Sequence, residues 1–249
     1  MLTRIDSFAR RRAIGLGVAL IGLLATAGIV SATAHFRYEH QLRRLLLSDA
    51  AAVANDKELT RFAAGVAKPL YAAHCASCHG DDMKGRKSLG APDLTDKTWL
   101  FGDGAVFDIE RTLLYGIRSG LSKSRNEADM PPFGLTGRLS DSEIRNLVQY
   151  LYQLSGRPHL AQAAIEGREV FADVAKANCA DCHGADAQGN SDYGAPDLTA
   201  NVWNGGDDEH ALYDAIYSGR HRIMPPFLGT LSLEQIRAMA VYIYMASHR

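Results

Sequence analysis

Apolar residues recur every three to four positions along most of the chain, and the strict apolar–polar alternation of a half-exposed strand is missing. Four segments have this helical period: Leu59 to Ala73, Asp108 to Ile117, Leu160 to Lys176 and Glu209 to Ile216. Two further helices are expected to start at capping boxes, formed by Ser140 with Glu143 and by Ser232 with Gln235. The pattern predicts an all-α fold.

The N-terminal region differs, because residues 13–34 carry no charged side chain and are rich in Leu, Ile, Val, Ala and Gly. At about 1.5 Å per residue, a helix of this length crosses the hydrocarbon core of a bilayer. Arg10, Arg11 and Arg12 precede it, so we expect residues 1–12 in the cytoplasm and a transmembrane anchor at 13–34. A signal peptide cleaved after Ala34 is the alternative, although the apolar run is longer than a usual signal core. In both interpretations the chain after residue 34 is exported across the membrane.

The rest of the chain contains an internal repeat. Its landmarks are Cys-x-x-Cys-His-Gly at 75–80 and 179–184, Gly-Ala-Pro-Asp-Leu-Thr at 90–95 and 194–199, Trp99 and Trp203, and Met-Pro-Pro-Phe at 130–133 and 224–227. The offset is 104 residues for the first three landmarks and 94 for the last, so the first copy has ten extra residues, which we place between Ser119 and Asp129. We expect a spacer helix or linker at 35–58 and two tandem domains, 59–156 and 157–249.

The Cys-x-x-Cys-His motif is the sequence that tethers a c-type haem. Its two thiols can add to the two vinyl groups of one porphyrin, and the histidine that follows is directed at the iron. A disulfide, a redox dithiol and a zinc site are the alternatives, but a redox dithiol is typical of alternating strands and helices, and zinc needs further ligands at finger-like spacing. We therefore predict two covalently bound haem c groups, attached at Cys75 and Cys78 and at Cys179 and Cys182, with His79 and His183 as iron ligands.

A methionine is expected to be the sixth ligand of each iron, because thioether and imidazole together give a low-spin iron of raised reduction potential. Met130 and Met224 each stand in a Met-Pro-Pro-Phe segment between the haem motif and the last helix of their repeat. The prolines stiffen the segment and so hold the sulfur in place. His221 is the main rival of Met224, but it has no counterpart in the first repeat.

These motifs resemble those of the class I cytochrome c family, and more closely those of the di-haem subunit III of cbb3-type oxidases. The resemblance covers roughly residues 59–249. It implies two tandem class I cytochrome c domains after a transmembrane helix. It also implies that the carbonyl of Pro92 serves His79 and that of Pro196 serves His183, fixing the ring orientation. Trp99 and Trp203 are expected to wall the haem pockets.

Two closed, six-coordinate haems would pass electrons without a catalytic residue in this chain. We expect electrons to come from a quinol-oxidising complex or a soluble cytochrome and to leave for a terminal oxidase. The protein is expected in the bacterial inner membrane, with its haem domains in the periplasm. A free-standing shuttle cytochrome is one alternative. A di-haem redox enzyme such as a peroxidase is another, for which a loose ligand loop at the insertion would be the only hint. The net charge of −1 gives no indication of nucleic acid.

Overall fold

The computed structural model describes the backbone of residues 3–126, 128–200, 203 and 205–248, and side chains from residue 23 onward except those at 50 and 51. Two compact units divide the chain, Met1–Leu47 and Ser48–Arg249.

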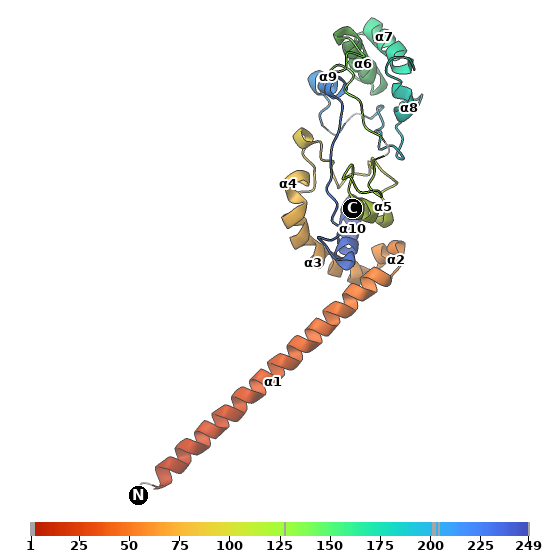
Figure 1. Ribbon diagram of the computed structural model, residues 1–249. Helices are drawn as coiled ribbons and strands as arrows, with labels where there is room; N and C mark the ends of the chain where they lie inside the picture. Colours follow the sequence, from red (N-terminus) through yellow and green to blue (C-terminus); the bar gives the residue numbers. More distant parts are fainter. Residues whose placement is uncertain (1–2, 127, 201–202, 204, 249) are drawn as a thin grey trace. The chain divides into compact units, whose positions relative to one another are not determined.

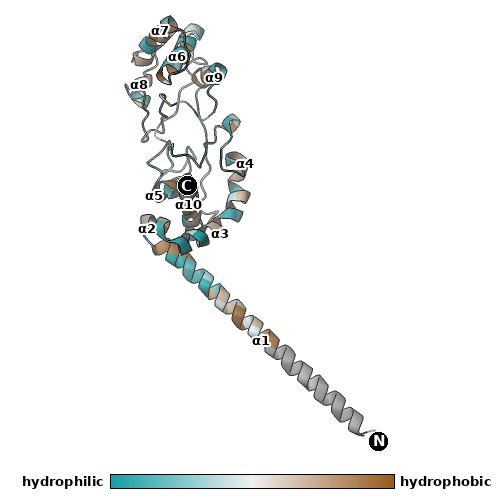
Figure 2. Ribbon diagram, turned by 180° about the vertical axis from the view of Figure 1, so that it is seen from behind, coloured by the Kyte–Doolittle hydropathy of each residue, from teal (hydrophilic) through white to brown (hydrophobic). Residues whose placement is uncertain are grey.

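The first unit is one helix, α1, which runs from Thr3 to Leu47 without a break (Figure 1). The expected boundary between an anchor and a separate spacer helix is therefore not visible in the backbone. Within the part of α1 whose side chains are described, apolar positions give way to polar ones toward the C-terminal end (Figure 2). Among the described residues, no helix is both long and apolar enough to cross a membrane. The expected anchor lies partly outside that set, because the side chains of residues 13–22 are not described.

The second unit is mainly helical, in agreement with the prediction from periodicity, and its extended pairings among the described residues are isolated bridges. Its helices are α2 (Ala50–Asn55), α3 (Lys57–His74), α4 (Ala76–His79), the 3-10 turn η1 (Lys87–Leu89), α5 (Val106–Tyr115), α6 (Asp141–Leu154), α7 (Ala161–Ala172), α8 (Cys179–His183), α9 (Glu209–Ser218) and α10 (Leu233–Ser247).

Side-chain caps define where several of these helices begin. Both expected capping boxes are present: Ser140 opens α6 with Glu143, and Ser232 opens α10 with Gln235. In each box the serine hydroxyl accepts from the backbone N–H three residues on, and the longer side chain accepts from the backbone N–H of the serine. These boxes stop α6 and α10 from extending toward the methionine segments that precede them.

The helix that leads into the first haem motif packs on the last helix of the chain. α10 contacts α3, α5 and α2, and buries an apolar face that includes Ile236 and Met239. Tyr71 of α3 meets Tyr242 of α10 edge to face, with ring centroids 6.2 Å apart. Arg237 of α10 forms an ion pair with Glu110 of α5. We call α2, α3, α4, α5 and α10 the first-motif lobe.

The helix that leads into the second haem motif packs on α6, which belongs to the first repeat. α6 also contacts α9, and α7 contacts α8. The α6–α7 crossing is close, because a Cβ on Gly167 would lie 2.1 Å from the Asn146 carbonyl oxygen. Gln149 of α6 donates to Glu209 at 2.9 Å and accepts from the N–H of Leu160 at 2.9 Å, which ties the three helices together. We call α6, α7, α8 and α9 the second-motif lobe.

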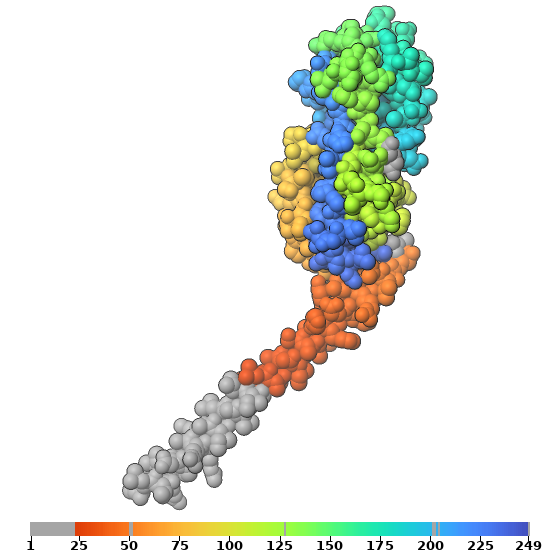
Figure 3. Space-filling view, viewed as in Figure 1, coloured from red at the N-terminus to blue at the C-terminus, as the bar shows by residue number. Residues whose placement is uncertain are grey.

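The two repeats therefore exchange their last helices. Two long segments make the exchange, one from α5 to α6 and one from α9 to α10 (Figure 1). In Figure 3 the blue C-terminal segment accordingly lies against the yellow residues of the first repeat. The helix pairing differs from that of two tandem domains at 59–156 and 157–249, in which α3 would pack on α6 and α7 on α10. Only six residues separate α6 from α7, so these neighbours pack directly on each other.

An ion pair between Glu143 of α6 and Lys176, just beyond α7, gives the second-motif lobe a pH dependence. The side-chain hydrogen bond from Lys176 lowers the pKa of Glu143 to about 2, from an ordinary value of 4.5. A lowered pKa in the folded state means that the stabilisation is present above pH 4.5 and is lost as the pH falls toward 2. We expect Glu143→Gln to lower the thermal midpoint at pH 7 but not at pH 2. A difference that is independent of pH would contradict this assignment.

Candidate functional site

The first haem motif forms a short turn of helix at the end of α3. Cys75 caps α3, and α4 carries Cys78 and His79. Gly80 then reverses the chain at a positive φ of 78°, and the imidazole Nδ1 of His79 lies 3.1 Å from the carbonyl oxygen of Pro92. The loop between them is closed by backbone hydrogen bonds, among them that from the Gly85 N–H to the His79 carbonyl at 2.8 Å. The motif and its proline therefore form one local unit.

The second haem motif repeats this geometry 104 residues later. α8 carries Cys179, Cys182 and His183, and Gly184 reverses the chain at a φ of 80°. The Nδ1 of His183 lies 3.0 Å from the carbonyl oxygen of Pro196. Both histidine–proline hydrogen bonds that the family resemblance implied are thus present. The roles of these residues in haem binding stay predictions.

The proline carbonyls decide which ring nitrogen of each histidine is free. A carbonyl oxygen can only accept, so Nδ1 carries the proton and Nε2 keeps its lone pair. Burial lowers the pKa of both histidines, against the opposing effect of the proline hydrogen bond, so the rings are neutral at pH 7. His79 and His183 therefore each present a neutral, oriented Nε2, which is the form that binds a metal.

None of the four cysteines forms a disulfide in the structure. Burial raises the pKa of Cys75 and of Cys179 to about 11. Redox dithiols work through a thiolate of lowered pKa, so this shift is opposite to what such chemistry needs. Two thiols and a free imidazole nitrogen on one helical turn fit covalent haem attachment.

Met224 enters the first-motif lobe from the second repeat. Its backbone exchanges two hydrogen bonds of 3.0 Å with Ile117, the second residue after α5. Further along, the Phe227 N–H donates to the Leu113 carbonyl at 2.9 Å, and the Phe227 ring lies 6.0 Å from that of His74. His74 directly precedes Cys75. The structure therefore brings Met224 together with the lobe of His79 and not with that of His183.

Met130 enters the second-motif lobe from the first repeat. Its carbonyl accepts from the Arg220 N–H at 3.0 Å, and Met130 packs against the apolar core that Cys179 and Ala180 also contact. Phe133, three residues on, is buried in that core and donates its N–H to the Ile216 carbonyl at 3.2 Å. Each lobe thus contains the histidine of one repeat and the methionine of the other.

The two tryptophans are not equivalent. Trp203 is buried in the core of the second-motif lobe, donates its indole N–H to the Asp197 carbonyl at 3.2 Å, and faces the Arg157 guanidinium at 5.0 Å. Trp99 is half-buried. Each tryptophan follows the loop whose proline carbonyl accepts from the histidine of its motif. That the tryptophans wall the haem pockets stays a prediction.

His221, the rival of Met224 as an iron ligand, binds the insertion of the first repeat. Its Nδ1 lies 2.6 Å from the Asp129 carboxylate, and the side chain is exposed. Asp129 directly precedes Met130, so His221 of the second repeat holds the end of the insertion in the first. This contact gives His221 a structural partner.

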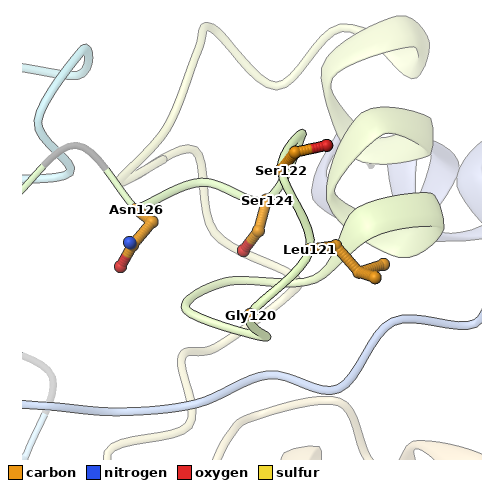
Figure 4. A pocket seen from close by; sticks show the side chains of 5 residues that line it. All are labelled: Gly120, Leu121, Ser122, Ser124 and Asn126. Carbon is orange, nitrogen blue, oxygen red and sulfur yellow. The ribbon is translucent and has the colours of Figure 1, made fainter.

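The insertion is tied to α5. Arg125 is buried, and its guanidinium binds the Asp108 carboxylate at 2.7 Å and the Thr112 hydroxyl at 3.1 Å. Ser124 is also buried, and its hydroxyl accepts from the Ser119 N–H at 3.0 Å. A shallow pocket beside them is lined by the insertion alone (Figure 4): Gly120, Leu121, Ser122, Ser124 and Asn126. These contacts hold Arg125 of the insertion against α5.

Two glycines that sequence reasoning missed bring the methionine segments close to the helices. Gly116 caps α5 at a φ of 71°, and a Cβ there would lie 2.3 Å from the Met224 carbonyl oxygen. Gly219 caps α9 at a φ of 70°, and a Cβ would lie 2.5 Å from the Met130 carbonyl oxygen. The sequence does show a glycine directly after α5 and another directly after α9. It does not show which methionine segment passes each glycine.

We expect Gly219→Ala to displace Met130 and to leave Met224 in place. At a φ of 70° and a ψ of −179° the backbone lies in a region that is essentially restricted to glycine, where a side chain costs on the order of 1–3 kcal/mol, and the clash with the carbonyl adds to this cost. The methionine–iron charge-transfer absorption of the oxidised protein should fall to about half, because one of the two predicted methionine ligands is disturbed. Gly156→Ala, also at positive φ but with open space around it, is the control for backbone strain alone.

Comparison with known proteins decides the family. The family model for subunit III of cbb3-type cytochrome c oxidase matches residues 63–151 and 162–243. The cbb3-type cytochrome c oxidase subunit FixP of Bradyrhizobium sp. (strain ORS 278) is 38% identical over 205 residues, which are 82% of this chain and 68% of that protein. The subunit CcoP of Cereibacter sphaeroides is 35% identical over 202 residues, 81% of this chain and 67% of that protein.

The chain belongs to the cbb3-type oxidase subunit III family. The cbb3-type cytochrome c oxidase subunit FixP of Sinorhizobium medicae is 30% identical over 220 residues, which are 88% of this chain and 73% of that protein. Membership of this cytochrome family implies haem c as the cofactor. The family match begins at Ala63, within α3, and ends at Ile243, within α10, so it includes both haem motifs and both methionine segments.

Proposed function

We propose that this subunit III protein carries electrons to a cbb3-type terminal oxidase through two haem c groups. The observation that carries the proposal is that each lobe contains a full set of donors for one closed iron. The set consists of two thiols and an oriented histidine on one helical turn, with a methionine on a facing segment. Its relatives are named as subunits of cbb3-type cytochrome c oxidases.

In this proposal His79 and Met224 would hold one haem iron, and His183 and Met130 would hold the other. The support comes from packing, since α10 and the Met224 segment contact the lobe of His79, and Met130 packs against the core of the other lobe, as Cys179 does. Bound haem c supplies a reversible one-electron iron couple at each site. The thioether of each methionine would raise the reduction potential of its iron and would leave no open position for a substrate.

The residues around each donor set hold one geometry through a redox cycle. The Pro92 and Pro196 carbonyls keep the histidine rings oriented and their Nε2 basic. Pro131 and Pro132, and Pro225 and Pro226, restrict the backbone beside each methionine. Because these contacts restrict how far the ligands can move, the reorganisation energy of electron transfer would be low. A low reorganisation energy suits a protein that passes electrons on.

We further propose that residues 13–34 anchor the protein in the bacterial inner membrane, with the second unit in the periplasm. The uncharged run after Arg10, Arg11 and Arg12 supports this orientation. A quinol-oxidising complex or soluble cytochrome would be the donor and the catalytic subunit of the oxidase the acceptor.

A redox titration with optical spectroscopy on the purified protein tests the proposed function. We expect two low-spin haems per chain, each with the methionine–iron charge-transfer band in the oxidised state, and no binding of carbon monoxide on reduction. A high-spin haem, or ready carbon monoxide binding, would mean an open iron and would contradict an electron relay.

A further inference from the structure

The guanidinium of Arg118 lies where the two methionine segments cross. The side chain is only 12% exposed. It forms an ion pair with Asp129, donates to the Ala128 carbonyl at 2.7 Å and donates to the Arg222 carbonyl at 3.3 Å. Asp129 and Ala128 directly precede Met130, and Arg222 stands two residues before Met224. One side chain therefore holds the approach to both methionines.

The backbone of Arg118 is bound at the same crossing. The neighbouring Ile117 exchanges two backbone hydrogen bonds with Met224. The N–H of Arg118 donates to the Arg125 carbonyl at 2.9 Å. Arg118 has a φ of 50°, a left-handed conformation that costs a residue with a side chain about 1 kcal/mol. Such a conformation persists only where the surrounding contacts require it. Here it directs the guanidinium at the two segments.

Two other charged residues lie near Arg118, namely Arg222 and His221, and each makes a side-chain contact on one side of the crossing. The Arg222 guanidinium donates to the Leu89 carbonyl at 2.8 Å, in the haem loop of the first motif. His221 binds Asp129 and so supports the end of the insertion before Met130. Planar guanidinium groups can bind several oxygens in fixed directions, which an ammonium group cannot.

From this geometry we infer that Arg118 is a positioning residue for both axial methionines, and that it couples ligand strength at the two irons. The inference rests on the proposed function, because it requires that Met130 and Met224 bind iron. Loss of the guanidinium frees both segments at once, so each methionine is displaced more readily by a competing ligand. A residue that only stabilised the first-motif lobe would affect Met224 alone.

Imidazole binding to the oxidised, haem-loaded full-length protein tests this inference. Imidazole competes with methionine for ferric iron, and the shifted proton resonances of each haem report its own iron. Charge-assisted hydrogen bonds of this kind contribute enough to change an equilibrium about tenfold. We expect Arg118→Gln to raise the imidazole affinity about tenfold at both irons. Arg222→Gln, which removes an equal charge from the same region, should raise it only at the iron of the first motif.

The outcomes separate the inference from the proposed function. An unmodified protein without two methionine-ligated irons would defeat the proposed function before any variant is compared. If it has both, an Arg118→Gln effect at one iron or at neither contradicts the inference, even where the thermal midpoint falls. Should Arg118→Gln fail to fold, Arg118→Lys keeps the charge and decides the question by the same criterion. Increased affinity at both irons in Arg118→Lys supports the positioning role.

Discussion

Replacing Met130 by leucine is expected to lower the reduction potential of the haem attached at Cys179 and Cys182, 49 residues further along the chain. The reason is that Met130 packs in the lobe of the second motif. Methionine raises the reduction potential of a histidine-ligated haem, and the choice of axial ligands changes haem potentials over a range of about 0.8 V. We therefore expect the potential to fall by an amount on the order of hundreds of millivolts. Covalent attachment should be unaffected, because the cysteines and His183 do not depend on the thioether.

A redox titration combined with proton NMR measures this effect. The altered haem is to be identified by its proximity to buried aromatic side chains of its own lobe, which are Tyr71 in the first-motif lobe and Phe171 in the second-motif lobe. Met224→Leu is the matched variant, and it should lower only the potential of the haem at Cys75 and Cys78. If Met130→Leu lowers the potential of that first haem instead, the ligands are paired within each repeat and our assignment is wrong.

Met239→Ala is the second change with a large expected effect. Met239 of α10 is fully buried, and truncation of a buried methionine or leucine destabilises a protein by about 2–5 kcal/mol. The loss should appear in α3 and α5, more than 120 residues earlier in the chain, because α10 packs on both. Leu147→Ala in α6, at a site 2% exposed, is the counterpart, and it should weaken α7 and α9.

Hydrogen exchange of backbone amides locates these losses. Met239→Ala should speed exchange in the first-motif lobe, and Leu147→Ala in the second-motif lobe. The opposite result for Met239→Ala, with faster exchange in α7 and protected amides in α3, would mean that α10 covers the helix of its own repeat.

The sequence was sufficient for the main helices of the second unit, and the family resemblance was sufficient for the histidine–proline contacts of each haem motif. Periodicity located α3, α5, α7 and α9, and Ser140 and Ser232 marked the starts of α6 and α10, because caps and apolar faces are local properties. The hydrogen bonds from His79 to Pro92 and from His183 to Pro196 followed from the family resemblance and span only thirteen residues each. Such short-range features change little with the rest of the fold.

The exchange of helices could not be predicted in the same way. A duplicated sequence gives α6 and α10 similar apolar faces, so either of them can cover α3 or α7. What separates the two arrangements is non-local: the length of the segments after α5 and α9 and the contacts at their crossing. Arg118, Asp129 and His221 make those contacts, yet each resembles an ordinary surface residue in the sequence. Residues 13–34 are a prediction of composition alone.

The most direct test of the exchanged arrangement is to cut the chain between α6 and α7, at a protease site inserted after Pro158, and to ask whether the two fragments separate. We predict that they stay together in native buffer, because α10 packs on α3 and α6 packs on α7. Denaturant should separate them, and both irons should then lose their methionine, since each fragment contains the histidine of one pair and the methionine of the other. Fragments that part without denaturant, each with a methionine-ligated haem, would contradict the account.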